Sequence, residues 1–140
     1  MSLSLPPIYY YTSVELVWVF ISPIIVLWDV AYVLLRPLSM SGGSLHRPLW
    51  IPYELYSKVD YLYGMPALER GDGLVSAFAI INFVESILYI WCAWKLYHES
   101  KTSLAHERYF EGRVGNKVLL VMFATSLTVC TKTILYGKRI

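Results

Sequence analysis

Two carboxylic acids interrupt apolar stretches of the chain, Asp29 within "LWDVAY" and Glu85 within "FVES". A carboxylate near the centre of a membrane span costs roughly 2.5 to 3.5 kcal/mol, whereas each Leu, Ile, Phe or Val returns only about 0.3 to 0.6 kcal/mol. Acids retained at this cost tend to face a bundle interior or a wet cavity, and they often mark a functional site.

Two such carboxyl groups in one bundle could act as the general acid and the general base of a proton transfer. The group kept protonated by an apolar site can donate a proton, while a better solvated group accepts one. The pair could also stabilise a cation inside an aromatic box. The structural alternative is that Asp29 and Glu85 are protonated and only hold helices together through hydrogen bonds. The residues expected to form the box are Trp18, Tyr32, Tyr89 and Trp91.

The spacing of polar residues allows the two acids to meet inside one bundle. Asn82, Glu85 and Tyr89 recur at i, i+3 and i+7, which places them on one face of a helix. Around Asp29, polar residues recur every seven positions and define a second inward face. The members of this second series are Glu15, Ser22, Asp29 and Arg36.

A third polar face carries Thr125, Thr128 and Lys132. Hydroxyl groups within a span often bond to their own helix backbone, so the two threonines are weak indicators of a site. We expect Lys132 to be an end residue whose ammonium reaches the membrane surface, rather than a partner of Glu85.

Composition predicts the elements that carry these residues. With 56% hydrophobic residues, 16% charged residues and a mean hydropathy of +0.49, the chain is typical of an integral membrane protein. Three stretches approach the roughly 20 residues needed to cross a bilayer, at about 14–35, 74–94 and 117–136. The fold class is therefore an all-α membrane bundle in contact with lipid. The net charge of +2 indicates no nucleic-acid partner, and no metal-binding or cofactor motif is present.

The two connections differ in composition. Residues 36–72 are rich in aromatic residues, and a short interfacial helix is predicted from Pro52 to Gly64. Its aromatic face would act either as an anchor at the membrane surface or as a lid over a binding chamber. The second connection, 98–113, is charged and polar, which predicts a solvated loop. The interfacial face consists of Tyr53, Tyr56, Asp60 and Tyr63.

These features together resemble the EXPERA superfamily, which includes the emopamil-binding protein and the sigma-2 receptor. The resemblance rests on "LWDVAY", on Trp50, Tyr53, Asp60 and Tyr61, and on "FVES", and it covers roughly residues 24–136. The connecting segment is most similar to small fungal members. The resemblance implies an endoplasmic reticulum membrane, intramembrane acids at Asp29 and Glu85, and a ligand-supporting acid at Asp60.

The chain also departs from the sterol isomerases of that superfamily. Ile25 stands where they have a histidine, and Leu88 stands where they have a threonine. Their last span, which supplies an Asn and a Trp to the cavity, is missing, so the single domain 1–140 is expected to be incomplete at its C-terminus. Three spans could restore the missing wall by forming a homodimer.

The leading hypothesis is an isomerase or cyclase without a cofactor, acting on a hydrophobic sterol or secondary metabolite. Asp29 and Glu85 would be its catalytic acid and base. The alternatives are a sterol-binding, lipid-binding or trafficking protein and a truncated vestigial member. The expected ligand-binding residues are Asp60, Tyr32, Tyr53, Tyr56, Asn82, Tyr89, Trp18 and Trp91.

Overall fold

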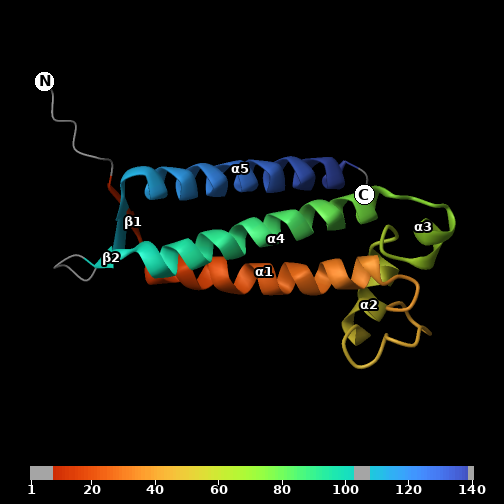
Figure 1. Ribbon diagram of the computed structural model, residues 1–140. Coiled ribbons are helices and arrows are strands. Elements are labelled where there is room, and N and C mark those ends of the chain that lie inside the picture. The colour runs from red at the N-terminus through yellow and green to blue at the C-terminus, as the bar shows by residue number, and fades with distance from the viewer. Residues whose placement is uncertain (1–7, 103–107, 139–140) are drawn as a thin grey trace, which may run out of the picture.

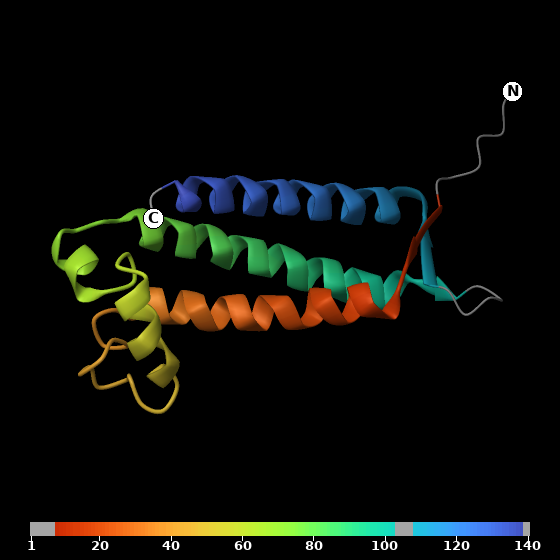
Figure 2. The same ribbon diagram turned by 180° about the vertical axis from the view of Figure 1, so that it is seen from behind.

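Three long helices form a membrane bundle in the computed structural model, which describes residues 8–102 and 108–138. They are α1 (Ser13–Leu34), α4 (Leu74–Glu99) and α5 (Gly112–Gly137), and each is long and apolar enough to cross a bilayer. Helix α4 lies between α1 and α5, and it packs most extensively on α1 (Figures 1 and 2). The predicted three-span bundle is confirmed.

Small side chains let α1 approach α4 closely. Ala79, Ser86 and Ala93 recur every seven residues along α4, and all three are buried. Small residues at helix interfaces in membranes favour close backbone packing. Val75, Asn82, Tyr89 and Leu96 alternate with them at spacings of three and four, which produces a continuous seam along one side of the helix.

The charged connection that was expected to be a solvated loop contains strands instead. Strands β1 (Ile8–Tyr11), β2 (Lys101–Thr102) and β3 (Arg108–Glu111) form an antiparallel sheet in the order β1-β3-β2. Because β1 leads into α1, β2 follows α4 and β3 leads into α5, the sheet joins one end of all three spans. Two spans are also longer than predicted, because α4 continues to Glu99 and α5 begins directly after β3.

The first connection folds over the other end of the bundle (Figure 1). It contains α2 (Ile51–Val59) and the five-residue α3 (Met65–Glu69). Arg36 joins it to the spans, since its guanidinium donates to the Leu62 carbonyl at 3.4 Å and to the Ser76 hydroxyl at 3.3 Å. The predicted helix over 52–64 is too long at its C-terminal end, because α2 ends at Val59.

Asp60 explains the early end of α2. Its backbone is extended, and its Oδ1 accepts a hydrogen bond from the Leu62 N–H at 3.0 Å. Aspartate side chains that bond to the backbone two residues later favour turns over helix. Tyr53 and Tyr56 lie on α2, whereas Tyr63 reaches the same region through this turn rather than along one helix face.

Two buried clusters support the opposite ends of the bundle. The cluster beside the sheet centres on Val19, Cys92, Leu96 and Val118. The cluster beside α2 is built on Tyr32, which is 1% exposed and stacks on Tyr53 with ring centroids 4.0 Å apart. Stacked aromatic pairs contribute about 0.5–1.5 kcal/mol beyond the area that they bury. Helix α2 is thus packed against α1 rather than lying alone at the membrane surface.

Candidate functional site

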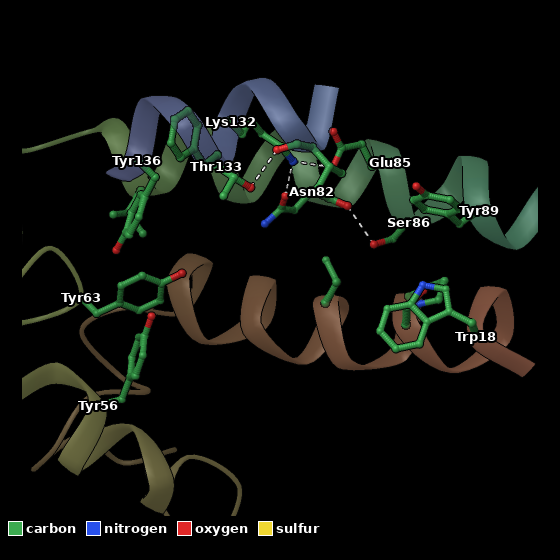
Figure 3. A pocket seen from close by; sticks show the side chains of 16 residues that line it. Trp18, Tyr56, Tyr63, Asn82, Glu85, Ser86, Tyr89, Lys132, Thr133 and Tyr136 are labelled. Atoms are coloured by element: carbon green, nitrogen blue, oxygen red, sulfur yellow. Dashed lines mark hydrogen bonds and ion pairs between the residues drawn. The ribbon is translucent and has the colours of Figure 1, made fainter. Parts of the chain in front are cut away.

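A cavity of about 410 Å³, here called the central cavity, lies between the three spans. Ser22 and Val26 of α1 form one wall, and residues of α4 and α5 form the others (Figure 3). Its walls are mainly apolar, and its volume lies within the range of about 300–1,000 Å³ found for small-molecule sites. The polar stripe predicted on α4 faces this space, since Asn82, Glu85 and Tyr89 all line it.

One wall of the central cavity holds a buried ion pair. The Lys132 ammonium of α5 donates to the Glu85 carboxylate and to the side-chain oxygen of Asn82, both on α4 (Figure 3). Glu85 is 7% exposed and Lys132 is 9% exposed. A buried carboxylate without a counterion would be very costly, and the ammonium supplies both the opposite charge and hydrogen-bond donors.

The prediction that Lys132 extends to the membrane surface is therefore wrong. Its side chain turns inward because two acceptors on α4 lie within its reach. One feature of the sequence could have indicated this inward orientation, namely that Lys132 lies on the same helix face as Thr125, which is also buried. Thr125 and Thr128 do bond to carbonyls of their own helix, as expected for hydroxyls in a span.

Asp29 does not meet Glu85. Its Oδ1 accepts from the Tyr53 hydroxyl at 2.6 Å, and its Oδ2 accepts from the Tyr63 hydroxyl at 3.1 Å. It lines a separate cavity of about 270 Å³ together with Trp28, Pro52, Tyr53 and Tyr56. The expectation that the two carboxylates share a site is wrong, because Asp29 lies near the end of α1 whereas Glu85 lies near the middle of α4.

Asp60 belongs to a third network, at the end of the central cavity. Its Oδ2 accepts from the Tyr136 hydroxyl of α5 and from the Tyr56 hydroxyl, the latter at 3.4 Å. Tyr56, Tyr63 and Tyr136 line the cavity at this end (Figure 3). The connecting segment thus caps the cavity, and Asp60 bonds that cap to α5. Neither Tyr63 nor Tyr136 was among the ligand-binding residues expected from the sequence.

The aromatic box expected from the sequence is divided among different places. Trp18 and Tyr89 line the central cavity, although Trp18 is 70% exposed. Tyr32 is buried in the cluster beside α2, and Trp91 packs against the cluster beside the sheet. Trp91 follows Glu85 by six residues, which places it about 240° around the helix and away from the same wall. The box is therefore absent from this site.

The capping tyrosines stay protonated to unusually high pH. Burial, together with the carboxylate of Asp29, raises the pKa of Tyr53 and of Tyr63 well above the usual value of 10.0. Burial and the nearby Asp60 carboxylate raise the pKa of Tyr56 in the same direction. The phenols therefore act here as hydrogen-bond donors to carboxylates.

Removing one partner of the ion pair should destabilise the bundle strongly. Lys132→Met leaves the Glu85 carboxylate buried without a counterion, and we expect a loss of about 3–5 kcal/mol in the free energy of unfolding. Adding Glu85→Leu should restore most of that loss, because no buried charge then remains. Denaturant unfolding in detergent micelles measures this cycle. A double variant no more stable than Lys132→Met alone would contradict it.

Alkaline pH should open the cap. Because the folded-state pKa values of Tyr53 and Tyr63 are raised, their contribution to stability is complete below the unfolded-state value and is lost as pH rises above about 10. We expect the thermal midpoint to fall between about pH 9 and about pH 11, and to fall less in a Tyr53→Phe, Tyr63→Phe variant. An equally steep fall in that variant would assign the effect to other groups.

The comparisons with known proteins give no relative from which a role could be transferred. No family model, no curated protein and no solved structure matches the chain. Within residues 8–102 and 108–138, no group of three or more His, Cys, Asp or Glu side chains could hold a metal ion.

Proposed function

We propose that this membrane protein binds a hydrophobic small molecule in the central cavity. The observation that carries the proposal is the cavity of about 410 Å³ among the three spans, with apolar walls and one polar cluster. A few polar groups on an otherwise apolar wall are typical of sites that orient a ligand. Tyr56 and Tyr63 of the connecting segment, which bond to Asp60 and Asp29, would then act as the lid of the chamber.

The resemblance to the EXPERA superfamily supports the same class of ligand, namely a sterol or a hydrophobic secondary metabolite. It also carries the proposed location in the endoplasmic reticulum membrane. A homodimer stays a prediction, in which a second copy would add a wall to the cavity. Binding or transport without conversion needs only the cavity and its lid.

Isomerisation by two carboxylates fits the geometry less well than binding does. Asp29 and Glu85 line different cavities and bond to different partners. One oxygen of Glu85 is paired with Lys132, and the other is buried and has no partner among the described residues. Proton transfer to a ligand would first require Glu85 to leave this enclosure. Isomerase activity stays a prediction that rests on the family resemblance.

Filling the central cavity should expel the ligand. Val129 of α5 lines the cavity, whereas Leu127 of the same helix is 59% exposed and does not line it. We expect Val129→Trp to lower the amount of co-purified hydrophobic molecules by about tenfold or more, as judged by mass spectrometry of the extracted protein. Leu127→Trp, the matched control, should retain them. Equal retention in both variants would place the ligand elsewhere.

Isotope exchange separates binding from conversion. If the site only binds, molecules that co-purify with the protein should gain no deuterium at carbon during incubation in D₂O. Deuterium gain that is lost in Glu85→Gln and retained in Asp29→Asn would instead show acid–base chemistry at Glu85. The thermal midpoint of each variant provides the control for folding.

A further inference from the structure

The ion pair determines which way the amide of Asn82 points. A lysine ammonium has three hydrogens to donate and can accept none. Because Lys132 bonds to the side chain of Asn82, the oxygen of that amide must face the ammonium. The NH₂ group then lies on the opposite side. In Figure 3 the nitrogen of Asn82 lies away from Lys132, toward the space between α4 and α1.

This NH₂ group has nothing to donate to within the described part of the chain. Among the described residues, the one hydrogen bond of the Asn82 side chain is that accepted from Lys132, and the residue lines the central cavity in a half-buried position. Ser86 bonds to the backbone carbonyl of Asn82 rather than to its amide. A polar group facing an apolar chamber gains from a partner that the chamber does not itself provide.

The charges beside the amide favour a neutral ligand. Glu85 and Lys132 compensate each other, so this wall has no free negative charge to attract a cation. The remaining carboxylate oxygen of Glu85 is buried and therefore does not offer an acceptor to the cavity. At Asn82 the wall presents a hydrogen-bond donor beside a compensated ion pair, and this suits an uncharged oxygen acceptor.

We propose that the central cavity selects an uncharged hydrophobic molecule bearing a carbonyl or hydroxyl oxygen, which accepts a hydrogen bond from the Asn82 amide. Lys132 is the positioning residue that keeps this amide turned toward the ligand. The inference rests on the proposed binding function and deepens it by naming the polar group of the ligand. It assigns ligand recognition to Asn82 rather than to the three acids.

Three probes with one ring skeleton test the inference. Fluorenone offers a carbonyl acceptor, fluorene has no polar group, and 9-aminofluorene carries an amine that is largely protonated at neutral pH. Equilibrium dialysis against protein-loaded and empty micelles of the same detergent measures the affinity of each probe. We expect fluorenone to bind about threefold to tenfold more tightly than fluorene, and the amine to bind more weakly than either.

Two variants connect the preference to the amide. Asn82→Asp keeps the shape and the acceptor for Lys132 but removes both donors, so fluorenone should lose its advantage and 9-aminofluorene should gain affinity. Asn82→Val removes the amide entirely and should leave fluorene and fluorenone equal. Thr131→Val is the matched control, because its exposed hydroxyl bonds to the Leu127 carbonyl outside the cavity. It should retain the preference of the unmodified chain.

The outcomes distinguish a failure of this inference from a failure of the proposed binding function. If fluorene and fluorenone bind the unmodified chain equally, recognition by Asn82 is overturned while binding in the cavity stands. If fluorenone keeps its advantage in both Asn82 variants, the acceptor site lies on another residue and the inference again fails. If Val129→Trp leaves the binding of every probe unchanged, the cavity is not the binding site, and both the proposed function and the inference are overturned.

Discussion

The buried contact between Lys132 and Glu85 is the interaction on which the arrangement of the spans depends. Helix α5 buries few of its residues, so shape alone would hold it weakly against α4. Two opposite charges inside an apolar bundle remain acceptable only while they stay together. The ion pair therefore sets how α5 is rotated against α4. By engaging Asn82 as well, it also determines which polar group the cavity presents.

The ends of the bundle are held by different means. At one end a three-stranded sheet joins the segments that flank the spans. At the other end, tyrosine hydroxyls bond to Asp29 and Asp60, which ties the first connection to α1 and α5. Backbone hydrogen bonds in the sheet and charge-assisted bonds in the cap fix both ends. The central cavity lies toward the capped end, where side chains rather than backbone close it.

Each of the three acids has a separate set of partners, and this separation is the reason for proposing ligand binding rather than isomerisation. Asp29 accepts from two tyrosines, Glu85 pairs with Lys132, and Asp60 accepts from Tyr136 and from a backbone N–H. Acids that are paired in this way stabilise tertiary contacts, although one oxygen of Glu85 has no partner among the described residues. A mechanism that needs two of them at one substrate would require rearrangement, whereas ligand binding uses the chamber as it stands.

The sequence by itself determined the number of spans, their approximate bounds and the inward-facing stripe at Asn82 and Glu85. These follow from the length of apolar stretches and from helical periodicity, which depend only on residues near one another in the chain. Only the tertiary structure decided which stripes meet. Three features depend on the relative height and rotation of separate elements: the contact of Lys132 with Glu85, the location of Asp29 in another cavity, and the pairing of the three strands. Periodicity within one helix carries no information about those two quantities.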